Sequence, residues 1–454
     1  MTRGRLQALL LGTAVVAASL VAAGQLIPRA APPPIVVGAV FPLAGSTGPL
    51  AVQEELGVRI AAQLVNADGG IGGRPIALDV RTLESGQEAP AVMASLHAEG
   101  AQVVIGAYAS GLSIAASAAA ADAGLVYWEA GAVADRLTGR GLPMVFRVGA
   151  SGANLGSNSA RFATSQLASL LGKQPGSLRL AIVAANDDYA TSVAAAATRE
   201  AAVAGAPIVL HATYDLTLPR WPQLMARLAA ARPDVIILAS HIPDGISFRR
   251  AMLAAKLHVG ALIGSTMAEC SPDFAGDLGA DAVGIFASDR PTAGFQPGAL
   301  NSEARANYDL LARAWTRAGG ASPVSSPDEA VEYGKDQGPE YGIHGPMLAG
   351  AGPTEEGLSG FSAAWVLFRD VLPAAANSPA LNAGTIASAA RQLDIPAGSL
   401  ANGAGVRFST DAATLGQNTR ATAVIWQWQA VRSYTFVWPA SYATGSIAMV
   451  PLPR

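Results

Sequence analysis

The chain has 454 residues, of which 51% are hydrophobic and only 14% are charged. This length exceeds that of one ordinary domain, and the apolar content suffices for a large buried core, so a disordered chain is excluded. The formal net charge is −3 and the sequence has no stripe of Lys and Arg, so no nucleic-acid partner is expected. Cys270 is the single cysteine, which excludes an internal disulfide and a cysteine-based metal site.

The first 34 residues predict export. Arg3 and Arg5 precede an uncharged run at 6–27 that is rich in Leu, Val and Ala, and a Pro-rich spacer ends at Pro34. This order is typical of a signal peptide. The run is also long enough to cross a bilayer, so an uncleaved anchor at residues 6–27 is a second interpretation. Both alternatives place the body of the chain in the periplasm or on the extracellular face of the cytoplasmic membrane.

From Ile35 onward two kinds of segment alternate. Nearly continuous apolar runs predict buried strands at 35–41, 75–81, 102–107 and 125–128. Ala-rich segments between them predict helices at 50–66, 87–100 and 111–123. Buried strands that alternate with helices are typical of a parallel sheet covered on both faces.

The same alternation starts again after residue 177. Strands are predicted at 178–184, 208–213, 235–240, 261–265 and 282–286, with helices at 189–204, 221–231 and 243–258. Helices at 301–318, 356–376 and 383–393 surround a Gly-, Pro- and Ser-rich excursion at 319–353, and strands are predicted at 403–408, 421–429 and 433–438. The sequence therefore predicts an α/β fold of two doubly wound lobes with parallel sheets.

Motifs of common catalytic and cofactor sites are missing. The sequence contains no GxSxG, HExxH or CxxC motif, no Walker loop and no GxGxxG. The glycine-rich run at 69–73 lies between a helix and a strand, the reverse of the order that a phosphate-binding turn needs, so it predicts a structural turn. The histidines show no ligand-like spacing, and only His241 lies where a ligand could reach it. We therefore expect no metal, no cofactor and no catalytic residue.

Polar and aromatic residues gather after the carboxyl ends of the predicted strands, where open α/β sheets bind ligands. The loops are 43–48, 108–112, 128–132, 187–189, 240–242 and 266–269. They come from both predicted lobes, which is the geometry of a small-molecule site in a cleft between two domains. Asp187 and Asp188 precede a predicted helix, and capping of that helix is their simpler interpretation.

Several motifs resemble those of the leucine/isoleucine/valine-type periplasmic (type I) solute-binding proteins of ABC transporters. They are PLAGSTG (42–48), NADGGIGGRPI (66–76), VVIGAYASG (103–111), GLVYWEAGAVADRLTGRG (124–141), FRVGAS (146–151) and NDDYATS (186–192). The resemblance covers residues 35–286 well and the remainder in outline. It implies two lobes joined by a three-crossover hinge that close over a solute, and the membrane permease of an ABC importer as partner. We also expect a monomer.

The resemblance implies crossovers near 147–151, 287–291 and 397–404. After the leader and spacer at 1–34, the first lobe would then consist of 35–148 and 289–398. The second lobe would consist of 149–288 and 399–454.

The resemblance also implies roles for particular residues. Ser110, beside Gly111 at the start of a predicted helix, matches a serine that hydrogen-bonds the ligand carboxylate, and helix N-termini attract anions. An ordinary N-cap is the alternative for Ser110. Gly131 and Ala132 match the backbone that lines the ligand's amino group, and Tyr189 matches an aromatic that closes over the ligand.

The sequence departs from the family at positions that contact the ligand. Val133 stands where threonine is common, and Leu50 replaces an aromatic. Where amino-acid binders place a glutamate against the ligand ammonium, the alignment puts Thr266, with Glu269 three residues later. Burial of an ammonium without a counter-ion is unfavourable. We therefore predict weak binding of leucine, isoleucine and valine and a preference for a small carboxylate or amide without a free α-ammonium, unless a shifted loop brings Glu269 into the site.

Together these observations predict a solute receptor of an ABC importer that traps a small polar solute (an amino acid, carboxylate or amide), and not an enzyme. The expected ligand-binding residues are Ser110, Gly111, Gly131, Ala132, Tyr189, His241, Thr266 and Glu269. A ligand-sensing ectodomain of the same fold and a secreted enzyme are the alternatives.

Overall fold

The computed structural model describes residues 32–45, 48–320, 352–431 and 433–453. The predicted leader and most of the excursion at 319–353 lie outside the described residues. Among the described residues, no helix combines the length and the apolar character that a membrane crossing requires. From Ile35 onward the chain forms one compact unit, which contains two sheets.

The first sheet contains five of the described strands in the order β2-β1-β3-β4-β5, and each pair is parallel. The strands are β1 (Ile35–Phe41), β2 (Ile76–Thr82), β3 (Val103–Gly106), β4 (Val126–Glu129) and β5 (Val145–Arg147). Successive side chains alternate between two apolar clusters, with Ala39 and Phe41 in one and Val40 in the other. Because both faces are buried, these strands appear in the sequence as continuous apolar runs.

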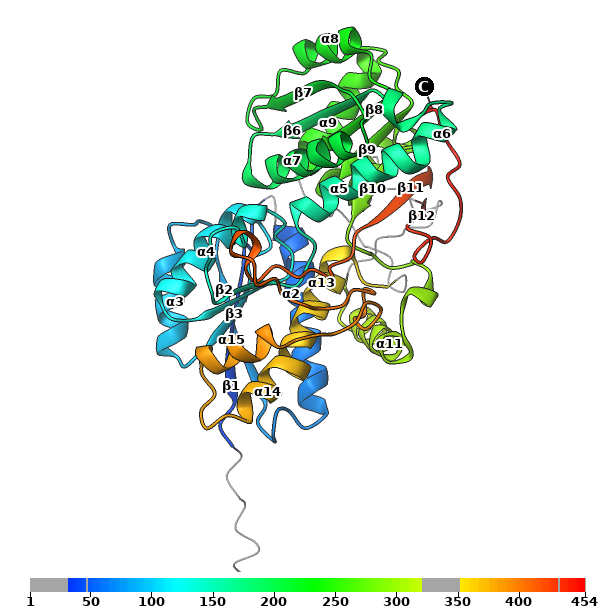
Figure 1. Cartoon of the computed structure of the whole chain (residues 1–454). Coiled ribbons are helices and arrows are strands. Elements are labelled where there is room, and N and C mark those ends of the chain that lie inside the picture. Colours follow the sequence, from blue (N-terminus) through cyan, green and yellow to red (C-terminus); the bar gives the residue numbers. More distant parts are fainter. Residues whose placement is uncertain (1–31, 46–47, 321–351, 432, 454) are drawn as a thin grey trace, which may run out of the picture. The chain divides into compact units, whose positions relative to one another are not determined.

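Helices cover both faces of the first sheet (Figure 1). Helices α3 (Ala89–Ala98) and α4 (Ser110–Asp122) share the cluster of Val40, whereas α2 (Gly48–Ala67) and α13 (Glu355–Val366) contribute to the opposite cluster. A Cβ on Gly57 would lie 2.2 Å from the Gly357 carbonyl oxygen, so only glycine allows α2 and α13 to pack this closely. The other helical segments of this part are η1 (Asp135–Leu137), η6 (Pro297–Ala299), α11 (Ser302–Arg317), η7 (Leu367–Val371), α14 (Leu372–Ala376), α15 (Ala383–Arg391) and η8 (Ala412–Thr414).

The second sheet contains seven of the described strands in the order β12-β11-β10-β9-β8-β6-β7. The strands are β6 (Leu180–Ala185), β7 (Ile208–Tyr214), β8 (Val235–Ala239), β9 (Ala261–Ser265), β10 (Phe286–Asp289), β11 (Val424–Ala430) and β12 (Ser433–Trp438). The pairs among β6 to β10 are parallel, whereas β11 and β12 add an antiparallel edge. The helical segments here are α5 (Gly152–Phe162), η2 (Ala163–Leu167), α6 (Ala168–Leu170), η3 (Pro175–Ser177), α7 (Asp188–Val203), α8 (Trp221–Ala231), α9 (Ile242–Ala254), η4 (Met267–Cys270), α10 (Pro272–Leu278) and η5 (Gly279–Ala282).

Within the described residues the chain passes between the two sheets three times. After β5, helix α5 packs against α7 and β10 of the second sheet. After β10, helices α11 and α13 return to pack against α2 of the first sheet. Finally β11 pairs with β10. The predicted α/β fold of two doubly wound sheets with a three-crossover connection is confirmed.

Some predicted elements are wrong. The strand predicted at 403–408 contributes only isolated bridges at Val406 and Phe408. Phe408 instead packs its ring against Trp128 and Phe146 of the first sheet, so its apolar character serves the core and not a strand. Helix α5 was not predicted, because its sequence is rich in Gly, Ser and Asn; it has Ser151 as its N-cap. The predicted strand at 282–286 is shifted, since β10 begins only at Phe286.

Candidate functional site

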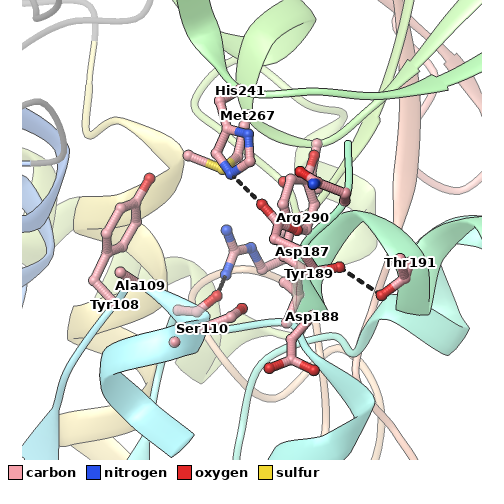
Figure 2. A pocket seen from close by; sticks show the side chains of 15 residues that line it. Tyr108, Ala109, Ser110, Asp187, Asp188, Tyr189, Thr191, His241, Met267 and Arg290 are labelled. Carbon is pink, nitrogen blue, oxygen red and sulfur yellow. Dashed lines mark hydrogen bonds and ion pairs between the residues drawn. The ribbon is translucent and has the colours of Figure 1, made fainter. Parts of the chain in front are cut away.

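A cavity of about 560 Å³ lies among loops that follow strands of both sheets. Figure 2 shows Tyr108 and Ser110 from the first sheet's loops on one side and His241 and Met267 on another. The lining of the cavity consists of Tyr108, Ala109, Ser110, Gly111, Gly131, Val133, Asn186, Asp187, Asp188, Tyr189, Thr191, His241, Thr266, Met267 and Arg290. The position beyond the carboxyl ends of parallel strands is where open α/β sheets bind ligands.

The N-terminus of α4 forms one wall of the cavity. Ala109 is the N-cap and has no side-chain cap, while Ser110 is the first helical residue. The Ser110 Oγ accepts a hydrogen bond from the Ala134 N–H at 3.2 Å and keeps its own proton for another acceptor. The first N–H groups of a helix have no partner inside it, so this wall presents donors that suit an anion. The N-cap interpretation of Ser110 is therefore wrong.

Backbone groups of the loop after β4 are already hydrogen-bonded within the protein. The Glu129 carboxylate accepts hydrogen bonds from the N–H groups of Gly131 and Ala132 at 2.9 and 2.8 Å. Arg290 donates to the Gly131 carbonyl oxygen, and buried Arg147 donates to that of Ala132 at 3.3 Å. These backbone groups are thus engaged by the protein itself and are poorly placed to hold a ligand's amino group.

Arg290 lies beside this loop, lines the cavity and is the centre of a buried charge cluster. Its side chain is only 5% exposed, and its guanidinium forms an ion pair with Glu355 at 2.5 Å and lies 3.4 Å from an Asp289 oxygen. Burial lowers the pKa of Arg290, but Glu355 and Asp289 outweigh burial and raise it. Burial raises the pKa of Glu54, and the nearby Glu129 raises it further. A cation is therefore fixed at the point where the family resemblance implied the ligand's ammonium.

The second sheet contributes a pair of opposite charges. His241 Nε2 lies 2.9 Å from Asp187 Oδ2, and this pair is drawn as a dashed line in Figure 2. The other Asp187 oxygen accepts the Ala190 N–H at 2.7 Å, which confirms Asp187 as the N-cap of α7. Burial lowers the pKa of His241, but its hydrogen bond to Asp187 and the Asp244 carboxylate 3.8 Å from Nδ1 outweigh burial and raise the pKa to about 9. The cavity therefore holds an imidazolium at neutral pH.

Tyr189 serves the architecture of this wall. Its hydroxyl donates to the carbonyl oxygens of Ser240 and Ser265 at 2.9 and 3.0 Å, which ties the ends of β8 and β9 together. Its ring packs edge-on against His241 with 5.1 Å between centroids. The ring lines the cavity while the hydroxyl is already bonded to the backbone, so the ring is the part that can face a ligand.

Backbone strain is concentrated at the cavity. Tyr108, Thr266 and Met267 have positive φ angles of 64°, 68° and 51°. Side chains other than glycine rarely adopt this region, least of all β-branched threonine, and each such residue costs about 1–3 kcal/mol. Strained residues of this kind are typical of ligand-binding clamps.

The sequence has clear relatives among known proteins. Residues 34–326 match a family described as "Periplasmic binding protein". Over 400 residues, 86% of this chain and 87% of the relative, the chain is 28% identical to "Leu/Ile/Val-binding protein homolog 8" of Brucella abortus.

This chain belongs to the periplasmic binding protein family. Its fold is similar to that of the branched-chain amino acid transporter substrate-binding protein LivJ from Streptococcus pneumoniae in complex with isoleucine, with a TM-score of 0.64, 18% identity, and coverage of 89% of this chain and 100% of that one. It is also similar to an ABC-transporter solute-binding protein from R. palustris in complex with benzoate, with a TM-score of 0.62, 17% identity, and coverage of 91% and 98%. The family and the fold are those of exported solute-binding proteins and not of enzymes.

Most of the predicted site residues of this periplasmic binding protein meet at the cavity. Those that line it are Ser110, Gly111, Gly131, Tyr189, His241 and Thr266. Ala132 and Glu269 are not among the lining residues. Glu269 is fully buried, lies against Gly264 beneath the cavity wall, and places one carboxylate oxygen 3.5 Å from the Ser240 hydroxyl. Burial raises the pKa of Glu269 to about 8. The shifted-loop alternative, in which Glu269 enters the site, does not occur in this structure.

Nine lining residues of the binding protein were not among the expected ligand-binding residues, and Arg290, Tyr108 and Met267 belong to these nine. Arg290 follows β10 in a region that was treated as a crossover, and Tyr108 and Met267 owe their places to unusual backbone conformations. Tyr108 and Met267 did fall within the strand-end loops, which was a usable signal. Among the described residues, no group of three or more His, Cys, Asp or Glu is arranged to hold a metal ion.

Proposed function

We propose that this periplasmic binding protein is the receptor of an ABC importer and that its solute is a small carboxylate or amide without a free α-ammonium. The observation that carries the proposal is the Arg290 guanidinium on the Gly131 carbonyl oxygen. An ammonium at this place would meet a carbonyl oxygen that a cation already engages. The relative from Brucella abortus carries a Leu/Ile/Val-binding name, and this proposal separates the chain from that ligand class.

The carboxylates at the cavity also argue against an ammonium. Asp187 is engaged by His241 and by a backbone N–H. Asp188 is paired with Arg136 at 3.3 Å and is 41% exposed. An incoming ammonium would have to compete with these cations. A carboxylate, in contrast, meets the N-terminus of α4 and the Ser110 hydroxyl, both of which favour negative charge, and the His241 imidazolium at the other end of the cavity (Figure 2) attracts it at longer range.

The lobes that would close over the solute are those expected from the sequence. We assign 35–148 and 289–398 to the first lobe and 149–288 and 399–454 to the second. The packing of α13 on α2 and the pairing of β11 with β10 support this division. Residues near 408–417 remain close to the first sheet, since Gln417 accepts a hydrogen bond from Arg147 at 2.6 Å, so we include them in the third crossover. We further propose that the chain acts as a monomer and that residues 1–34 export it, with residues 6–27 as either a cleaved leader or an anchor.

Calorimetry with a matched pair of ligands tests the proposed solute. Leucine and 4-methylpentanoate share the carboxylate and the branched tail and differ only in the α-ammonium. We expect 4-methylpentanoate to bind at least tenfold more tightly than leucine, because burial of an unpaired ammonium is costly. His241→Gln should weaken binding of the carboxylate. A micromolar dissociation constant for leucine that is lost in Glu269→Gln would contradict the proposal and restore the amino-acid interpretation.

A further inference from the structure

A second cavity of about 470 Å³ adjoins the first one. His241 and Met267 belong to the linings of both cavities, so these two side chains form the boundary between the cavities. Ser110 and Arg290 line only the first cavity. The proposed carboxylate position and the second cavity therefore lie on different sides of the junction formed by His241 and Met267.

The second cavity differs from the first in chemistry. Apolar side chains dominate its lining, namely Leu50, Leu216, Pro219, Ile242 and Pro243 together with Met267. Its one carboxylate, Asp244, is only 4% exposed and accepts hydrogen bonds from the Tyr214 hydroxyl and from the His241 N–H. The Thr217 hydroxyl donates to Asp215 at 2.7 Å. Asp244 and the Thr217 hydroxyl are thus engaged, and the apolar majority of the lining favours apolar ligand atoms.

Met267 suits the junction between the two cavities. Its unbranched side chain has several rotatable bonds and a polarizable sulfur, so it adapts to ligand groups of different shape. Figure 2 shows its sulfur beside the His241 ring, at the end of the cavity away from Ser110. The positive φ of Met267 fixes the direction in which the side chain leaves the backbone.

We propose that the solute of this protein carries an extended apolar tail that runs from the first cavity past Met267 into the second cavity. The inference rests on the proposed function and deepens it: the carboxylate or amide head binds at Ser110 and the α4 N-terminus, and an alkyl or aryl chain longer than a leucine side chain fills the second cavity. Leu216 and Leu50 are then specificity-determining residues, because they contact the tail and not the head.

Calorimetry on the exported, purified chain tests this inference with benzoate, 3-phenylpropanoate and 5-phenylpentanoate. Each buried CH₂ group should tighten binding about fourfold, so the longest ligand should bind at least tenfold more tightly than 3-phenylpropanoate. Leu216→Trp fills the second cavity and should weaken 5-phenylpentanoate at least tenfold while benzoate changes less than twofold. Leu218→Trp is the matched control, because Leu218 is 67% exposed and lines neither cavity, and it should change neither affinity.

A second variant keeps the test valid if Leu216→Trp fails to fold. Ser247→Phe adds bulk to the second cavity from α9 and should reproduce the selective loss of the long ligand. If benzoate and 4-methylpentanoate bind but affinity does not rise with chain length, or if Leu216→Trp and Ser247→Phe weaken all ligands equally, the tail inference is overturned and the proposed function stands. If none of these carboxylates binds, the proposed solute class fails and the tail inference fails with it.

Discussion

The two walls of the first cavity are built from different groups. The wall from the first sheet presents the helix N-terminus at Ser110, and the backbone of the neighbouring loop is hydrogen-bonded by Glu129 and Arg290. The wall from the second sheet presents charged side chains, above all the pair of Asp187 and His241. A backbone wall recognises a ligand through fixed dipoles that do not titrate, whereas a side-chain wall carries a charge that depends on pH.

Removal of Arg290 should disrupt the first wall, and among the proposed variants it should cause the largest loss in the free energy of unfolding. Arg290→Met leaves the buried carboxylates of Glu355 and Asp289 without their cation, which should lower the free energy of unfolding by about 3–5 kcal/mol. Urea unfolding measures this loss. The matched control is Arg369→Met, because Arg369 pairs with Asp68 where both side chains are exposed, at 43% and 68%. It should cost less than about 1 kcal/mol, and an equal loss in the two variants would contradict the role given to the buried cluster.

The contribution of the second wall to the free energy of unfolding should depend on pH. His241 has a folded-state pKa of about 9, above its ordinary value of 6.5, so its stabilising contribution is complete below pH 6.5 and is lost as the pH rises to 9. The free energy of unfolding of the natural chain minus that of His241→Gln should therefore fall by about 3 kcal/mol across this window.

The difference between the two chains is needed because other groups titrate nearby. Burial raises the pKa of Glu269 to about 8 and that of Glu356 to about 7. Both chains keep these glutamates, so their contributions cancel. A difference that does not change with pH would show that the imidazolium does not stabilise this wall. Affinity for a carboxylate should fall in the same direction above pH 9, as the cation is lost.

Loss of the Ser110 hydroxyl tests recognition by the first wall. Ser110→Ala should weaken carboxylate binding by about 1–3 kcal/mol, because a buried ligand oxygen loses its donor. Calorimetry measures the change, and urea unfolding should show a separate loss of about 1 kcal/mol, because the buried Ala134 N–H loses its acceptor. An unchanged affinity would place the head of the solute elsewhere in the cavity.

The smallest effect is expected from the hydroxyl of Tyr189. Tyr189→Phe removes the donor to the Ser240 and Ser265 carbonyl oxygens, so stability should fall by about 1–2 kcal/mol. Solute affinity should stay within about threefold, since only the ring faces the cavity. A large loss of affinity without a loss of stability would mean that the hydroxyl contacts the solute directly.

Much of the architecture was predictable from local patterns. The strand at Ile35–Phe41 and the helix at Trp221–Ala231 agree with their predicted limits, because an apolar run and a proline in the first helical turn are local signals. The expectation that ligands bind beyond the carboxyl ends of the strands also predicted most of the loops that line the cavity. Where local signals were weak, as in the Gly- and Asn-rich α5, the packing of α5 on α7 decided the structure.

The charges of the site were decided by tertiary structure alone. Arg290 meets Glu355 and Gly131, which lie 65 and 159 residues away in sequence, and His241 meets Asp187 from a different strand-end loop. A sequence pattern shows that a carboxylate or guanidinium exists but not which one is buried beside it, and burial with a specific partner sets both its pKa and its availability to a ligand. For the same reason the sequence could not show that Glu269, whose carboxylate could pair with a ligand ammonium, lies in the core while Arg290 lines the cavity.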